Sequence, residues 1–177
     1  RTVIGNPHPD FTFGFTNTFT YRNFSLKVFL RGSVGGDVMN MAWGSTPYRM
    51  IANGPRSWLN RWQSPENPGD GKTPRVKLTN RGIIDFEQLD STFIEDGSFL
   101  NIQNISLSYR VPNSLIKKIR LNNLVFTFTV NNAYMWTKYT GYNPEGRMNI
   151  GSTLAPGVDW GTYPLARTYM FTIATNF

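Results

Sequence analysis

Apolar and polar residues alternate along positions 166–177, the last twelve residues of the chain. Successive residues of a β-strand point to opposite sides. Mostly aromatic and aliphatic side chains would therefore share one face, and small or polar side chains the other. Twelve residues exceed the about 5–6 that are usual for a globular strand, but a tilted strand that crosses a bilayer needs about 9–11. The pattern predicts a long, two-faced strand that ends on the aromatic residue Phe177.

The same alternation predicts four further strands, arranged as two hairpins. The five predicted strands are residues 11–21, 24–33, 99–110, 124–136 and 166–177. Arg22 and Asn23 would form the two-residue turn of the first hairpin, where Asn suits a positive φ. The second hairpin has a longer turn, in which Asn113 or Ser114 could cap one helical turn.

The apolar phase changes within the predicted strand 99–110. Leu100 and Ile102 fall on the opposite phase from Ile105. A shift of one residue turns every following side chain to the other face. We therefore expect a β-bulge or a change of face near Gln103 and Asn104.

Two long segments without alternation, about 34–98 and 137–165, separate the hairpins from each other and from the last strand. Short turns and long loops therefore alternate, and all short turns fall on one side of the sheet. This asymmetry is typical of outer-membrane β-barrels, which have short periplasmic turns and long extracellular loops. Five strands do not close such a barrel, and lipid does not tolerate open strand edges. We expect a C-terminal barrel segment, in which strand 166–177 also pairs with a strand outside this sequence.

Composition supports an all-β chain with an unusual apolar face. Aromatic residues make up 15% and charged residues only 16%, against about 25% charged residues in typical soluble domains. The net charge is +7, but the basic residues are scattered, which argues against nucleic-acid binding. The chain has no Cys and one His, so thiolate metal sites are excluded and histidine-based zinc ligation or catalysis is disfavoured. We expect no metal and no cofactor.

Acidic residues do not indicate an enzyme. A glycosidase needs two carboxylates held across a cleft, and the spacing of the acidic residues selects no such pair. They are Asp85, Glu87, Asp90, Glu95 and Asp96. Glu95, Asp96 and Gly97 are better explained as the turn that starts the third strand. We therefore assign no catalytic residue.

Four blocks of sequence stand out along the chain. They are residues 5–15 (GNPHPDFTFGF), 93–100 (FIEDGSFL) with 104–109 (NISLSY), 131–145 (NNAYMWTKYTGYNPE), and 163–164 (YP) with 166–169 (ARTY). In this order they resemble the last strands of SusC/RagA-type TonB-dependent transporters. The resemblance implies the last five strands of a 22-stranded barrel in the outer membrane of Bacteroidota. Such transporters carry an N-terminal plug and a TonB box, which are not in this sequence.

The same resemblance implies a function and a set of partners. The family imports oligosaccharides or peptides, and TonB–ExbB–ExbD relays the proton-motive force that drives import. A SusD-like surface lipoprotein caps the barrel, and lipid surrounds it. The resemblance also implies that the assembly machinery of the outer membrane reads the terminal Phe177.

Loop aromatic residues are the candidate contacts to the substrate or to the lipoprotein. They are Trp43, Tyr48, Trp58, Trp62 and Trp160. Aromatic rings suit both sugar faces and protein interfaces, but they could instead pack the loops together or anchor them at the membrane interface. Trp58 and Trp62 lie in a possible short helix, residues 57–62, with Ser57 as its N-cap. Tyr134 and Trp136, at the loop end of a strand, are predicted membrane-girdle residues.

Three basic residues in predicted strands, Lys27, Arg31 and Arg110, are candidates for the barrel interior. Charges there either pair and hydrate or contact the substrate. The rival interpretation of the whole chain is a soluble β-sandwich that binds glycans. It explains the loop tryptophans and the alternation, but not the strand length, the loop asymmetry or the low charge. An isolated chain that folds as a soluble monomer without detergent would favour the sandwich.

Overall fold

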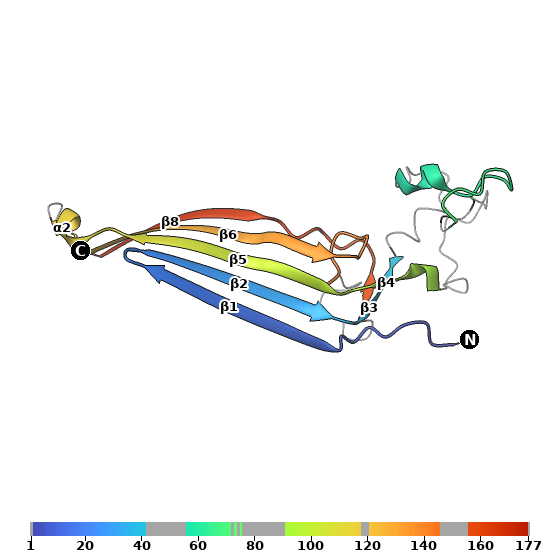
Figure 1. Cartoon of the computed structure of the whole chain (residues 1–177), viewed down its shortest axis with the longest axis horizontal. Helices are drawn as coiled ribbons and strands as arrows, with labels where there is room; N and C mark the ends of the chain where they lie inside the picture. Colours follow the sequence, from blue (N-terminus) through green and yellow to red (C-terminus); the bar gives the residue numbers. More distant parts are fainter. Residues whose placement is uncertain are drawn as a thin grey trace.

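A single-layer antiparallel sheet of five strands dominates the computed structural model, which describes residues 2–41, 56–71, 73, 75, 91–117, 121–145 and 156–176. The strands are β1 (Phe11–Tyr21), β2 (Phe24–Val34), β5 (Phe99–Arg110), β6 (Asn123–Thr137) and β8 (Thr168–Asn176), in that spatial order. Figure 1 shows the sheet as one long layer, with no second sheet lying against it in the described part of the chain. The predicted all-β antiparallel architecture is confirmed.

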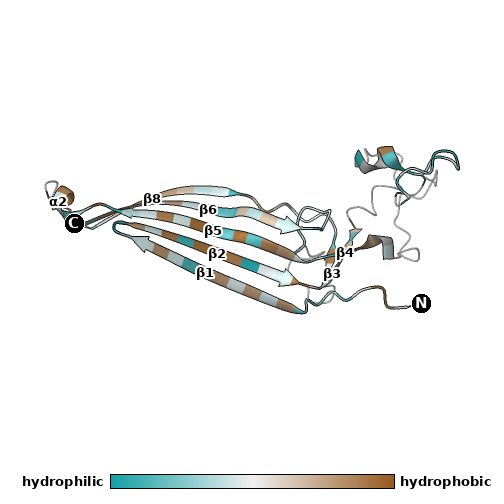
Figure 2. Cartoon of the chain, viewed as in Figure 1, coloured by the Kyte–Doolittle hydropathy of each residue, from teal (hydrophilic) through white to brown (hydrophobic). Residues whose placement is uncertain are grey.

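One face of this sheet, here called the apolar face, carries large apolar side chains from every strand. The cross-strand register aligns one complete row, which consists of Phe19, Leu26, Leu107, Phe128 and Phe171. Four of these five side chains are at least 45% exposed, and Leu26 is half-buried. The strands accordingly show repeated hydrophobic positions in Figure 2. Because soluble monomers rarely expose large contiguous apolar patches, this face is a candidate contact surface for lipid or for another protein.

The opposite side, here called the polar face, is lined by hydroxyl groups. One row of cross-strand partners consists of Thr20, Ser25, Ser108, Thr127 and Thr172. The hydroxyls of Ser108 and Thr127 lie 2.9 Å apart, and those of Ser106 and Thr129 lie 3.0 Å apart. These hydroxyls bond to one another across the strands, so the polar face suits contact with water or a polar ligand.

A β-bulge keeps the apolar face continuous, as the phase change predicts. Ile105 pairs with Val28 and Ile102 pairs with Leu30, so Gln103 is an extra residue of β5 relative to β2. A matching irregularity lies in β6, where Asn132 adopts a φ of 50°. The Asn132 side chain donates a hydrogen bond of 3.0 Å to the carbonyl of Ala166. The bulge therefore also holds the segment that enters β8.

The turns differ in detail from the sequence predictions. Arg22, not Asn23, takes the positive φ, of 51°. Asn23 instead donates its amide to the carbonyl of Arg110, at 2.7 Å, and so ties the first hairpin to β5. The helical turn α2 (Asn113–Ile116) is present, but its N-cap is Pro112 without a side-chain hydrogen bond. The prediction that Asn113 or Ser114 caps it is wrong, because both lie inside the turn.

A second, three-stranded sheet joins the two long loops. It contains β4 (Ile94–Asp96), β3 (Asp37–Asn40) and β7 (Val158–Asp159), in that order. β3 is antiparallel to β4 and parallel to β7. Figure 1 places this small sheet at the end of the large sheet that lies away from α2 and the C-terminus. The loops are therefore organised rather than structureless next to the strands.

Short 3-10 helices complete the described elements. η1 covers Arg56–Asn60, and η3 covers Ser91–Phe93. The predicted helix 57–62 with Ser57 as its N-cap is wrong in type and position, because Ser57 lies within η1. Among the residues that the structure describes, no helix has the length and apolar character needed to span a membrane.

Replacing Asn132 tests the role of the bulge. Asn132→Ala should lower the free energy of unfolding by about 1–2 kcal/mol. Alanine is strained at positive φ, because it has a β-carbon and no polar side chain to compensate, and the change also removes one hydrogen bond. Asn132→Gly should recover the backbone part of this loss. Urea unfolding of the full-length protein in detergent measures both. Equal losses in the two variants would show that the positive φ contributes nothing.

Candidate functional site

Polar contacts connect the small sheet to the ends of β2 and β6, and we call this region the loop base. Its centre is the Glu95 carboxylate on β4. Glu95 Oε2 accepts the backbone N–H of Thr140 at 2.7 Å, and Oε1 accepts the Thr140 hydroxyl at 2.8 Å. Oε1 also accepts the side-chain amide of Asn40, at 2.9 Å. One carboxylate thus joins β3, β4 and the segment that leaves β6.

A buried phenol and carboxylate form the second part of the loop base. Tyr139 donates its hydroxyl to Asp159 Oδ2 at 2.6 Å. Asp159 is 1% exposed, and its Oδ1 accepts the backbone N–H groups of Gly161 and Thr162, at 3.0 and 2.8 Å. Both oxygens of the buried Asp159 carboxylate are therefore hydrogen-bonded, and they join β7 to the segment after β6.

The two groups shift each other's protonation. Burial raises the pKa of Tyr139, and the hydrogen bond to Asp159 and the negative charge there raise it further. Burial alone would raise the pKa of Asp159, but hydrogen bonds from Tyr139, Thr162 and Gly161 outweigh burial, so that pKa is lowered. The stabilisation from Asp159 is therefore fully present above the ordinary Asp pKa of about 3.9. It is lost as the pH falls through the lower pKa of the folded state.

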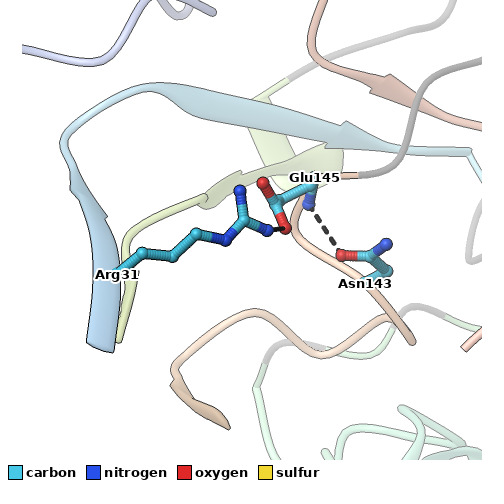
Figure 3. Close-up of polar contacts among 3 residues, drawn as sticks. All are labelled: Arg31, Asn143 and Glu145. Carbon is cyan, nitrogen blue, oxygen red and sulfur yellow. Dashed lines mark hydrogen bonds and ion pairs between the residues drawn. The ribbon is translucent and has the colours of Figure 1, made fainter. Parts of the chain in front are cut away.

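The third part of the loop base is an ion pair that reaches the polar face. Arg31 on β2 donates from Nη2 to Oε2 of Glu145, in the loop that follows β6. Figure 3 shows the two side chains pointing toward each other, with the Asn143 side chain accepting the Glu145 backbone N–H at 3.0 Å. The Arg31 guanidinium also lies over the Phe99 ring, 5.6 Å from its centroid. Arg31 therefore connects the polar face to both β5 and the second loop.

A cavity of about 550 Å³ lies where the polar face meets the loop base. Arg31, Glu145, Phe29 and Phe99 contribute to its wall, together with residues 7–9 of the N-terminal segment. Its size falls in the range of about 300–1,000 Å³ that is usual for small-ligand sites. Charged and aromatic groups therefore face a space large enough for part of a polar ligand.

The structure does not gather the predicted loop aromatics into one described site. Trp43 and Tyr48 lie outside the described residues, and Trp58 belongs to η1 without a described side chain. Trp62 follows η1 and has the Arg75 guanidinium 5.9 Å from its ring centroid. Trp160 directly follows β7 in the loop base and is exposed. Their contacts to a substrate or partner stay predictions.

Tyr134 and Trp136 lie on the apolar face at the loop end of β6. Their cross-strand partners are Ile102 and Leu100, and their rings meet edge-on with centroids 4.7 Å apart. Both are about half exposed. This placement suits a girdle, and the role stays a prediction. Phe177 lies outside the described residues.

The acidic residues weighed as a carboxylate pair either lie outside the described residues or make structural contacts. Asp85, Glu87 and Asp90 lie outside the described part of the chain, and Glu95 is used in the loop base. Asp96 accepts the backbone N–H of Ser98 at 2.9 Å, which forms the turn into β5. No group of three or more potential metal ligands occurs among the described residues.

Sequence reasoning missed most of the loop base. Asn40, Tyr139 and Asp159 received no role, because their partners are 20 or more residues away and the loops show no alternation. Glu95, Tyr139 and Glu145 stand in the family-like blocks, but no pattern in the sequence pairs them with their partners. Arg31 was predicted to face the interior, and it lies on the polar face.

Comparisons with known proteins agree with this architecture. No family model matches the chain. It is 30% identical over its whole length to TonB-dependent receptor P3 of Formosa agariphila, of which it covers 17%. It is 25% identical over its whole length to TonB-dependent receptor SusC of Bacteroides thetaiotaomicron, of which it covers 16%. The chain therefore spans about a sixth of these relatives.

Solved structures show the same fold. In the 'closed-closed' state of the RagAB peptide importer, a segment that is 18% of one chain matches 99% of this chain, with a TM-score of 0.75 and 23% identity. The 'open-open' state matches 96% of this chain, with a TM-score of 0.72. The resemblance to SusC/RagA-type TonB-dependent transporters is confirmed, and the sheet has the fold of a segment of such a protein. The number of 22 strands stays a prediction.

Tyr139→Phe tests the buried contact of the loop base. The change leaves the Asp159 carboxylate without one donor, so local stability should fall by about 1–3 kcal/mol. Hydrogen exchange of the full-length protein, read by mass spectrometry, should show faster exchange in β3 and β7 but not in β1. Tyr163→Phe is the matched control, because Tyr163 is 87% exposed. Equal exchange in both variants would contradict a stabilising role for the Tyr139 hydroxyl.

Proposed function

We propose that the chain is the C-terminal barrel segment of an outer-membrane TonB-dependent importer of the SusC type, which takes up oligosaccharides or peptides. The observation that carries the proposal is the two-faced sheet, whose apolar face is exposed on all five strands while its polar face is lined by hydroxyls. In a barrel wall the first face meets lipid and the second meets the lumen. The similarity to SusC over the whole chain supports the same function.

The height of the apolar face agrees with a bilayer. Trp136 marks its loop end, and Phe126 lies opposite Tyr109 near its turn end. These two β6 residues are ten positions apart, which is about 33 Å along a strand at 3.3 Å per residue. A strand tilt of about 40° reduces this to about 25 Å, the height of the apolar band in outer-membrane barrels. Tyr134 and Trp136 would form the outer girdle, and Tyr21, Phe24 and Tyr109 the inner one.

The open edges of the sheet fit a partial barrel. In the described residues, β1 pairs only with β2, and β8 pairs only with β6. Within a membrane, unpaired backbone groups cost several kcal/mol each, so both edges would pair with other strands of the same protein. A β-sandwich would instead need a second sheet against the apolar face. Figure 1 offers no support for one in the described residues.

The proposed partners follow from this orientation. The loop base and the two long loops would face the cell exterior, where a SusD-like lipoprotein caps the barrel. Trp43, Tyr48, Trp58, Trp62 and Trp160 are the proposed contacts to that lipoprotein or to the substrate. The plug and the TonB box, which connect to TonB–ExbB–ExbD, would belong to the rest of the protein.

An uptake experiment tests the proposed function. The full-length gene is deleted in its native host, and growth is measured on panels of oligosaccharides and peptides as sole nutrients. At least one growth defect should appear, and the intact gene should restore growth only when TonB is present. A TonB-independent protein, or a receptor absent from the outer-membrane fraction, would contradict the proposal.

Two neighbouring residues of β8 test which face meets lipid. Phe171→Arg should destabilise the folded barrel by about 2–4 kcal/mol, because Arg is costly near the bilayer midplane. Thr172→Arg, one position away on the polar face, should cost much less. The folded fraction of each full-length variant is read from heat-modifiable migration of outer-membrane extracts. A larger loss for Thr172→Arg would reverse the assignment of the faces.

A further inference from the structure

Two neighbouring polar side chains on the polar face retain unused hydrogen-bonding groups. Arg31 on β2 and Asn101 on β5 are direct cross-strand partners, so their side chains lie on the same face. Asn101 is 1% exposed, and neither its Nδ2 nor its Oδ1 has a hydrogen-bond partner among the described residues. Arg31 Nε is also buried without a partner in the described part of the chain. Buried polar groups are nearly always satisfied, so this pair calls for an explanation.

The geometry of Arg31 indicates what kind of group would satisfy it. Nε and Nη2 form one edge of the guanidinium, which can bind both oxygens of a carboxylate. Glu145 uses only Nη2 of this edge. The Phe99 ring packs against the guanidinium and orients it. The edge formed by Nε and Nη2 of Arg31 is therefore oriented for a carboxylate, and Glu145 engages only one of its two donors.

The surroundings give such a ligand room to enter. Arg31, Glu145 and Phe99 all line the cavity of about 550 Å³ at the loop base. Glu145 comes from the loop after β6, and its backbone N–H is held by the Asn143 side chain. Its carboxylate thus occupies one side of the Arg31 fork, as Figure 3 shows.

We propose that Arg31 and Asn101 form a carboxylate-binding subsite, which Glu145 occupies until an acidic substrate displaces it. The substrate carboxylate takes both Nε and Nη2 of Arg31, and the Asn101 amide supplies a further donor. This proposal rests on the proposed function, because the substrate must pass along the polar face. It narrows the substrate class to oligosaccharides with uronic acids or to peptides with acidic groups. Competition with Glu145 disfavours neutral substrates at this position.

Binding measurements on the full-length receptor, purified in detergent, test the subsite. The probes are trigalacturonate with its methyl ester, and a Glu-containing tripeptide with its Gln counterpart. Glu145→Gln should bind one of the two acidic probes about tenfold more tightly than the unaltered receptor does, because the internal competitor is gone. Arg31→Met should abolish that binding, and Asn101→Leu should weaken it several-fold. The acidic probe that binds distinguishes a sugar acid from a peptide acid.

Arg110→Met is the matched control, because it also removes an arginine from the sheet. Arg110 lies at the turn end of β5, beside Asn23, and therefore at the opposite end of the strand from the loop base. It should leave probe binding unchanged. The proposal is overturned if acid and neutral probes bind alike, if neither acid binds the Glu145→Gln receptor, or if Arg31→Met has no effect. A full-length structure with the plug bound to Arg31 would also overturn it.

The uptake experiment separates this proposal from the proposed function. If import depends on TonB but is unaffected by Arg31→Met, and no acidic probe binds, the proposed subsite is wrong and the proposed importer function stands. If an acidic probe binds and binding requires Arg31, but the receptor imports nothing, the proposed importer function is wrong and the proposed subsite stands. Heat-modifiable migration checks that each variant is folded.

Discussion

The rest of the structure depends on one constraint. A single-layer sheet has no second layer against which its apolar face can pack. Each strand places mostly apolar residues on one side, and the other side carries most of the hydroxyl, amide and charged groups. In the described part of the chain, no second layer covers the apolar row that runs through Phe128 and Phe171. At about 25 cal/mol per Å², leaving such a face in water would oppose folding. The sheet is therefore stable only where its surroundings cover the apolar face.

This constraint explains why the bulge lies where it does. All apolar side chains must stay on one side over the full height of the sheet, and the sequence changes phase between Ile102 and Ile105. The extra residue in β5 and the positive φ of Asn132 in β6 restore the common face. The same irregularity releases the Asn132 amide to bind Ala166. A requirement on the apolar face thus fixes how the chain enters its last strand.

Features with local causes could be predicted from the sequence, and features with distant causes could not. The strands follow from a period of two that each segment carries by itself, and the phase change at Gln103 is visible in the same way. The loop base depends instead on pairs such as Asn40 with Glu95 or Arg31 with Glu145, which are 55 and 114 residues apart. The first turn shows a smaller limit. Asn23 has the local preference for positive φ, but its side chain is hydrogen-bonded to the carbonyl of Arg110 on β5. Arg22 takes the positive φ instead.

The three contacts of the loop base differ in how completely they are satisfied, and that difference bears on function. Glu95 and Asp159 each accept several hydrogen bonds, so moving either carboxylate would break several contacts at once. They fix the small sheet to the end of the large one. Arg31 is partly exposed and uses only one of the two donors on its Nε–Nη2 edge, and the side chain of its neighbour Asn101 has no hydrogen-bond partner among the described residues. Exchanging Glu145 for another carboxylate would therefore add hydrogen bonds at Arg31 without disturbing the other two contacts. A rigid base with one replaceable ion pair allows a ligand to bind while the loops keep their positions.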